Sequence, residues 1–175
     1  VPALVGRISY TGDLGYEIWV KPEYHRRLFD DLMAVGEIYK IGLFGSRALN
    51  ALRLEKNFGS WVREFRPVYY PNETGLERFC DFKKASNFIG KEAAAKASSQ
   101  AGGAHRLRNF ILETKDADVI GDEPIFYKGE IAGWVTSGGY AHASGVSMAM
   151  GYVRTELAEQ EDGWSVELLA EMLSA

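Results

Sequence analysis

The chain has 175 residues, of which 20 are Lys or Arg, 24 are Asp or Glu and 46% are hydrophobic. This composition fits one large or two small folded domains, and it excludes a disordered polyampholyte and a coiled coil. The net charge of −4 speaks against a nucleic-acid partner. No apolar run approaches the roughly 20 residues that a membrane-spanning helix requires, so we expect neither a nucleic acid nor a membrane as partner.

The cysteine and histidine content predicts neither a disulfide nor a metal site. Cys80 is the one cysteine, which agrees with a reducing compartment, either the cytoplasm or the mitochondrial matrix of a eukaryote. Its place in an apolar alternation predicts a buried thiol. His25, His105 and His142 are too far apart to show a metal-ligand spacing.

The first residues read like the interior of a larger protein, because neither an initiator Met nor a signal peptide precedes the first strand pattern. Residues 7–10 and 16–20 predict two strands, and the five residues between them contain two glycines, which is typical of a hairpin. In the second strand, Glu17 and Trp19 share one face. A carboxylate is thereby expected beside an aromatic surface.

Two segments then show helical spacing of their apolar residues. The first begins at Pro22 and ends at Gly36, and the second covers residues 47–56. Both are expected to cover a sheet. A third helix is predicted over residues 88–97, and the small, flexible residues 98–104 after it predict a domain boundary.

After residue 104 the sequence changes to short β-like runs separated by glycines and charged turns. The runs cover residues 107–114, 124–127, 130–137, 147–153 and 164–169. The acidic strip 156–175 is interpreted as solvated surface. We therefore predict an α+β protein, with a mixed α/β part over residues 1–100 and a small antiparallel β-barrel over residues 104–175.

Residues 40–66 carry six basic and two acidic side chains, in contrast to the acidic remainder. Such a patch can bind a small anion. The interpretation favoured from the residues alone is a solvated helix face with local ion pairs.

Four segments resemble the aminomethyltransferase family, which includes the T protein of the glycine cleavage system. They are YTGDLGYEI at residues 10–18, LRLE at 52–55, FIGKE at 88–92 and VTSG at 135–138, all in the family's order. Residues 48–56 and 61–67 are also similar to the folate-binding C-terminal region of sarcosine and dimethylglycine dehydrogenases.

The resemblance implies tetrahydrofolate binding and capture of the one-carbon unit that is released from a small N-methyl amine. FAD is expected only in a further, N-terminal part of such a parent chain, where a flavin domain would oxidise the amine. The family's catalytic aspartate precedes the part matched here, so no catalytic residue is assigned and the isolated chain is expected to be inactive.

Three site residues follow from the resemblance. Glu17 corresponds to the family glutamate that binds the pterin, and Tyr10 to the tyrosine beside it. The physics agrees, because an ionised carboxylate can accept two adjacent N–H donors and tyrosine offers a flat apolar surface. Arg47 is the nearest match to an arginine about thirty residues later, although alignment on LRLE brings Leu49 and Asn50 there instead.

Trp61 and Trp134 are expected to serve packing rather than ligand binding. Two alternative functions stay open: a glycine cleavage aminomethyltransferase, and a binding or assembly module without catalysis.

Overall fold

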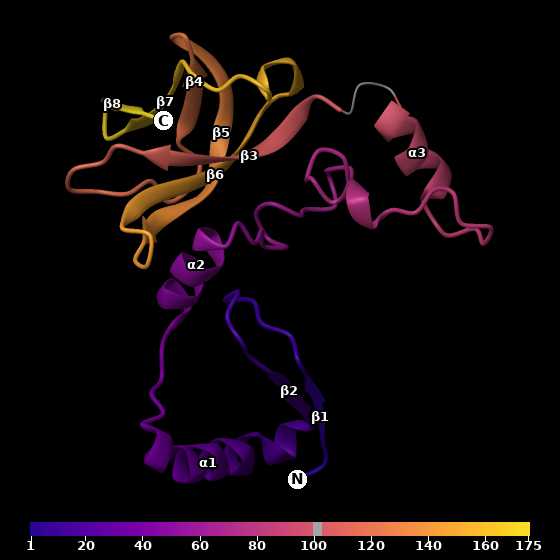
Figure 1. Ribbon diagram of the computed structural model, residues 1–175, viewed down its shortest axis with the longest axis vertical. Coiled ribbons are helices and arrows are strands. Elements are labelled where there is room, and N and C mark those ends of the chain that lie inside the picture. The colour runs from indigo at the N-terminus through magenta and orange to yellow at the C-terminus, as the bar shows by residue number, and fades with distance from the viewer. Residues whose placement is uncertain (100–102) are drawn as a thin grey trace.

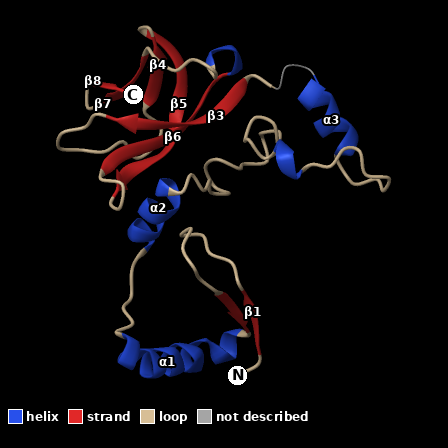
Figure 2. Ribbon diagram, in the orientation of Figure 1, coloured by secondary structure: helices blue, strands red, loops and turns tan. Residues whose placement is uncertain are grey.

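The computed structural model describes residues 1–99 and 103–175, and it contains two parts of unlike construction (Figure 1). The first part carries a small hairpin and the helices, and the second is a six-stranded antiparallel sheet. The three α-helices therefore all precede the main sheet along the chain, with one short helical turn beside the sheet (Figure 2), and the α+β prediction is confirmed.

The opening hairpin consists of β1 (Ala3–Gly6) and β2 (Glu17–Val20), which pair antiparallel. The strand predicted over residues 7–10 is wrong, because these residues belong to a ten-residue connection between the strands. A side-chain hydrogen bond of 2.8 Å between the Ser9 and Thr11 hydroxyls favours this loop over a ladder. The predicted alternation in β2 is confirmed, with Glu17 and Trp19 on the exposed face.

The first helix was predicted correctly in extent but not in packing. A 3-10 turn, η1 (Pro22–Tyr24), leads into α1 (His25–Gly36), and η2 (Glu37–Tyr39) follows. The expectation that this helix covers a sheet is wrong. α1 lies away from the six-stranded sheet (Figure 1), and Leu32 and Val35 on it are exposed.

The second predicted helix is α2 (Ser46–Glu55), and it does cover the main sheet, where it packs against β5 and β6. The chain then passes through η3 (Glu77–Phe79) to α3 (Lys91–Ser99). α3 begins later than the predicted residue 88 because Gly90 has a φ of +85°, which is outside the helical region. Of the boundary predicted at residues 98–104, residues 100–102 lie outside the described residues.

The main sheet has the strand order β3-β6-β5-β4-β7-β8. Its strands are β3 (His105–Leu112), β4 (Pro124–Tyr127), β5 (Glu130–Ala141), β6 (Val146–Arg154), β7 (Trp164–Leu168) and β8 (Glu171–Ser174). The solvated strip predicted over 156–175 is wrong, because after η4 (Thr155–Leu157) residue Ala158 is buried and β8 pairs with β7.

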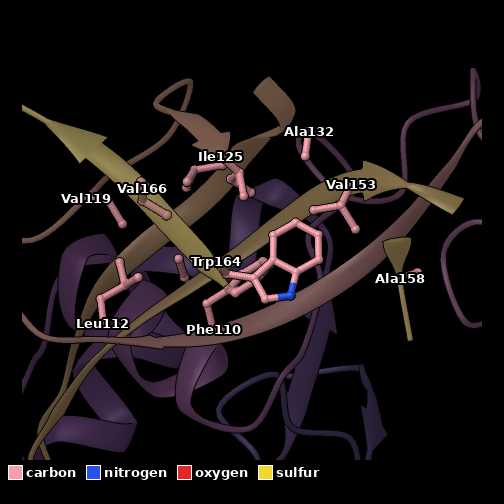
Figure 3. Close-up of a cluster of buried hydrophobic side chains, with 11 residues drawn as sticks. Phe110, Leu112, Val119, Ile125, Ala132, Val153, Ala158, Trp164 and Val166 are labelled. Atoms are coloured by element: carbon pink, nitrogen blue, oxygen red, sulfur yellow. The ribbon is translucent and has the colours of Figure 1, made fainter. Parts of the chain in front are cut away.

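The sheet curves as a barrel does but does not close. One main-chain hydrogen bond of 3.2 Å, from the Glu113 N–H to the Ser174 carbonyl, joins the end of β3 to β8. Trp164 lies inside the curve, with Phe110 edge-on at 5.5 Å between ring centroids (Figure 3). The surrounding core residues are Leu112, Val119, Ile125, Ala132, Val135, Ala149, Val153, Ala158 and Val166. Within residues 1–99 and 103–175, no helix is both long and apolar enough to cross a membrane.

Candidate functional site

Glu17 and Tyr10, two of the predicted site residues, line one cavity of about 740 Å³. Glu17 is the first residue of β2, and Tyr10 lies in the loop that joins β1 to β2. Phe44 and Trp61 line the same cavity. The cavity thus combines an acidic residue with aromatic ones, although Trp19, which the strand alternation places beside Glu17, is not among its lining residues.

Tyr10 is held at this cavity by its hydroxyl, which donates a hydrogen bond of 3.3 Å to the carbonyl oxygen of Gly59. Burial raises the pKa of the Tyr10 hydroxyl, so the side chain stays protonated and neutral at physiological pH. The ring therefore offers an apolar face and a fixed hydroxyl on the cavity wall.

Arg47 lies at the exposed start of α2 and lines a second cavity, of about 900 Å³. Tyr10, Ser60 and Val62 line both cavities, so these residues form the wall between them. The structure accordingly brings Tyr10 together with each of the other two predicted residues, whereas Glu17 and Arg47 line different cavities.

The second cavity is lined by more basic than acidic residues. Besides Arg47 it is lined by Arg53, Arg63, His142 and one acidic residue, Asp118. Arg63 pairs with Asp122 at 3.1 Å, and both side chains are largely exposed. Within the described residues, no carboxylate lies within ion-pair distance of Arg47. Arg47 is therefore free to bind an anionic group there.

A buried polar network behind this cavity was missed by the sequence analysis. The Arg53 Nη1 atom lies 3.2 Å from Glu64 Oε2, and the two side chains are 4% and 0% exposed. Ser137 on β5 joins them, since its hydroxyl accepts a hydrogen bond of 2.6 Å from Arg53 Nη2 and donates one of 2.5 Å to Glu64 Oε1. The prediction of a solvated charge patch is thus wrong for Arg53 and Glu64.

The network is completed by the main chain. Ser60 N–H donates to Glu64 Oε2 at 2.7 Å, and the Tyr152 hydroxyl donates to the Glu64 carbonyl at 2.6 Å. Burial raises the pKa of the Glu64 carboxyl, but the hydrogen bonds from Ser137 and Ser60 and the charge of Arg53 outweigh it, so the pKa is lowered. Glu64 is therefore an ionised, fully partnered carboxylate.

The signal for this network was present in the spacing of α2. Arg53 follows Leu49 by four residues, which places it on the same face of the helix as a half-buried leucine. A cation on an apolar face needs a buried partner. Local pattern could not identify Glu64 as that partner. Its burial depends on β5, from which Ser137 hydrogen-bonds Glu64 although it lies more than seventy residues later in the chain.

LRLE and VTSG, two of the motifs that carried the resemblance, meet at the α2–β5 contact. Arg53 of the first hydrogen-bonds Ser137 of the second. Glu55, two residues after Arg53, accepts hydrogen bonds of 2.5 Å from both the main-chain N–H and the hydroxyl of Ser144 in the β5–β6 turn. These motifs thus join the helical part to the sheet.

Three further expectations have mixed outcomes. Trp134 packs between His105 and Tyr152, with ring centroids 4.8 and 5.9 Å away, which confirms its packing role. Trp61 does not pack in a core, since it is 79% exposed beside the Glu17 cavity.

Cys80 is half-buried rather than in the core, and it lies at the C-terminal end of the short turn η3. Among the described residues no His, Cys, Asp and Glu cluster is arranged to hold a metal ion.

Comparison with known proteins identifies the family. The model of the GCVT N-terminal domain matches residues 1–84, and that of the glycine cleavage T-protein C-terminal barrel domain matches residues 105–175. Mitochondrial dimethylglycine dehydrogenase from Mus musculus is 41% identical over 169 residues, which cover 97% of this chain and 19% of that protein. The aminomethyltransferase of Streptomyces coelicolor is 32% identical over 155 residues, which cover 87% of this chain and 41% of that protein.

The fold has a counterpart among solved structures. The crystal structure of glycine cleavage system aminomethyltransferase T from Bartonella henselae matches with a TM-score of 0.85 at 24% sequence identity, over 97% of this chain and 46% of that one. The chain thus spans about a fifth of the dimethylglycine dehydrogenase and less than half of each aminomethyltransferase. With both of its parts matched by domains of one protein, the chain belongs to the glycine cleavage T-protein, or aminomethyltransferase, family.

Proposed function

We propose that this chain is the tetrahydrofolate-binding region of a one-carbon transferase that captures the methylene group of an N-methyl amine of the sarcosine or dimethylglycine type. The observation that carries the proposal is the cavity in which the Glu17 carboxylate lies beside Tyr10 and further aromatic rings. Identity of 41% with a dimethylglycine dehydrogenase over nearly the whole chain supports the amine class.

The residues around this cavity fit a reduced pterin. A pterin presents adjacent N–H donors on one edge, and Glu17, as a carboxylate, can accept two of them. Tyr10, Phe44 and Trp61 supply apolar surface for its rings. The Ser60 hydroxyl is buried at the same wall and has no hydrogen-bond partner in the described residues, so it can satisfy one polar atom of a ligand.

Tetrahydrofolate, when bound, supplies the nitrogen that accepts the one-carbon unit. The chain's own residues then bind and orient it: Glu17 fixes the pterin edge, Tyr10 borders the ring, and Arg47 across the shared wall attracts the anionic end of the folate. Apolar walls around the reacting group also limit its contact with water.

The remaining components of the proposal belong to a parent protein. FAD and the methylated amine would be bound in a flavin domain of the same parent chain, and residues 1–100 and 104–175 would form its folate-binding and barrel domains. The cytoplasm or the mitochondrial matrix is the proposed compartment, and the mitochondrial dimethylglycine dehydrogenase supports the second.

The second candidate is an aminomethyltransferase of the glycine cleavage type, which the 32% identity with the Streptomyces protein favours. The two candidates differ in whether the parent protein carries a flavin that accepts electrons from the amine. A parent protein with bound flavin that is bleached by dimethylglycine or sarcosine supports the first, and a flavin-free parent supports the second.

The test is an anaerobic titration of the protein with tetrahydrofolate. Glu17→Gln keeps the shape of the side chain but removes the charge, so we expect the Kd to rise about tenfold or more, since a charge-assisted hydrogen bond contributes about 1.5–3 kcal/mol. Glu130→Gln is the matched control, because Glu130 also starts a strand and is exposed, yet lies at the turn between β4 and β5. Equal affinities of wild type and Glu17→Gln would contradict the assignment and favour a module without folate chemistry.

A further inference from the structure

The loop of residues 58–60 lies between the buried ion pair and the Tyr10 side chain. Arg53 Nη1 donates to the Phe58 carbonyl at 3.1 Å, and Ser60 N–H donates to Glu64 Oε2 at 2.7 Å. The residue between these two, Gly59, accepts the hydrogen bond from the Tyr10 hydroxyl. The Tyr10 hydroxyl is thus anchored on a loop that the ion pair holds from both sides.

Gly59 has to be a glycine for this arrangement. A Cβ at this position would lie 2.5 Å from the Phe65 ring and 2.9 Å from Glu64 Cβ, closer than carbon atoms can approach. The Gly59 main chain therefore packs closely against the Phe65 ring and the base of the Glu64 side chain, and we expect a displacement of Glu64 to reach Gly59.

The ion pair is in turn fixed by the sheet. Ser137 follows an irregularity in the β5–β6 register, between Val135 and Ser137, and its hydroxyl contacts both Arg53 and Glu64. Arg53 Nη1 also lies 3.6 Å from the Met150 sulfur on β6. A continuous series of contacts therefore leads from β5, through the ion pair and the 58–60 loop, to Tyr10.

The energetics of the Arg53–Glu64 ion pair suit a role in positioning its neighbours better than a role in stabilising the fold. A buried ion pair loses its hydration, and well-packed apolar residues of similar volume stabilise a fold equally well or better. A fully hydrogen-bonded pair, however, fixes the groups around it in one arrangement. The atoms fixed in this case are those of the wall shared by the two cavities, Tyr10 and Ser60.

We propose that Arg53, Glu64 and Ser137 are positioning residues, which set the place of Tyr10 in the folate cavity and thereby couple the barrel to ligand binding. The expected effect on folate affinity rests on the proposed function. The expected effect of Ser137 on the position of Tyr10 does not depend on any ligand. In the described residues no hydrogen bond joins Ser137 to Tyr10, so the hydrogen-bonded route between them passes through the network.

The first experiment is fluorine NMR of the protein labelled with 3-fluorotyrosine, in which Tyr10→Phe assigns the Tyr10 resonance among the nine tyrosines. We expect Ser137→Ala to shift this resonance and Ser137→Thr, which keeps the hydroxyl, to restore it. Tyr127 is the internal control, because its hydroxyl is engaged with Gln160 in the barrel, 3.3 Å away. A general loss of structure in the Ser137 variant would shift the resonances of both Tyr10 and Tyr127. An unchanged Tyr10 resonance would overturn the inference.

The second experiment is a double-mutant cycle on tetrahydrofolate affinity. Ser137→Ala should raise the Kd about fivefold in the wild-type background and less than about twofold when Tyr10 is already Phe, since the two residues act through one contact. Equal losses in both backgrounds would contradict positioning through Tyr10.

The two experiments separate the two proposals. A protein that binds folate independently of Glu17 refutes the proposed function, while the fluorine spectrum still decides whether Ser137 positions Tyr10. Folate binding that needs Glu17, together with a Tyr10 resonance that ignores Ser137, refutes the positioning role alone. If Ser137→Ala lowers the yield of folded protein, Arg53→Lys tests the same contacts with the charge retained.

Discussion

The two parts of the molecule differ in how they bury apolar surface. In the barrel part, residues 105–175, eleven side chains, including Trp164, form one core (Figure 3). In residues 1–99, Leu54 is the one large aliphatic side chain among the buried hydrophobic residues, whereas most of the exposed large hydrophobic residues of the described chain are found there. Burial of apolar surface, the main source of folding free energy, is thus concentrated in the barrel.

The first part depends on the second through α2. Leu54 and the Arg53–Glu64 pair are buried where α2 contacts β5 and β6, whereas the hairpin and α1 lie apart from the sheet (Figure 1). The comparison teaches that substitutions of buried groups, in the barrel or at the α2 contact, should cost stability, and that substitutions on the exposed surface of α1 should cost little. The largest loss is expected at the centre of the barrel core.

The largest loss is expected from Trp164→Ala. Trp164 is 4% exposed, packs against Phe110 and Tyr127, and donates its indole N–H to the Gln160 carbonyl at 3.0 Å. Removal of such a ring costs about 3–5 kcal/mol in the free energy of unfolding. Urea unfolding followed by circular dichroism measures it. Trp164→Phe should lose less, and a loss under about 1 kcal/mol for Trp164→Ala would contradict a core centred on this ring.

Glu64→Gln should come next, with a loss of about 3 kcal/mol, because it leaves the buried Arg53 charge without its partner. Urea unfolding at neutral pH measures this loss, and the exposed Glu130→Gln is the control. A neutral result would show that the first part does not depend on the ion pair.

The same variant gives a pH dependence with a defined sign. Burial raises and the hydrogen bonds and Arg53 lower the pKa of the Glu64 carboxyl in the folded protein, with a net lowering. As the pH falls, the unfolded state therefore takes up its proton first, near the ordinary value of about 4.3. The stability difference between wild type and Glu64→Gln should be complete above about pH 5 and shrink below about pH 4. A difference that grows in acid would contradict this sign.

The barrel could be predicted from the sequence to a larger extent than the rest, and its construction explains why. Strands such as β4 at Pro124–Tyr127 are short, apolar and bounded by turn residues, so local pattern determined them. β8 was missed because it has only four residues, begins at the acidic Glu171, and is held by pairing with β7 rather than by its own pattern. The strand order of the sheet, and the fact that it stays open, depend on long-range pairing and were not visible in the sequence.

For the candidate site, the resemblance predicted Tyr10 and Glu17, and the structure shows that both line one cavity. Local pattern could not show that Arg47 lines a separate cavity, because the position of α2 is set by its contact with the sheet. Arg53, Glu64 and Ser137 lie up to 84 residues apart in sequence. Such a network follows from tertiary structure, and spacing predicts only that Arg53 requires a partner.

Gly138→Ala should destabilise the protein by about 1–3 kcal/mol, the usual cost of overpacking. A Cβ on Gly138 would lie 2.3 Å from the Val119 carbonyl oxygen, a main-chain atom that cannot yield as a flexible side chain does. Gly42→Ala is the matched control, because nothing lies within 4 Å of a Cβ there. Thermal unfolding of both variants measures the difference, and equal midpoints would contradict the contrast in packing between the two parts.

Leu32→Ala in α1 should have the smallest effect, within about 0.5 kcal/mol, as is usual for surface positions. Leu32 is 43% exposed, whereas Leu54 on α2 is 1% exposed, so Leu54→Ala is a control with the same chemistry and an expected loss of about 2–5 kcal/mol. Urea unfolding of the two variants at several protein concentrations measures both losses. A loss of similar size for Leu32→Ala would mean that α1 is covered in solution, and a loss that grows with protein concentration would mean that a second copy covers it, because association stabilises by mass action.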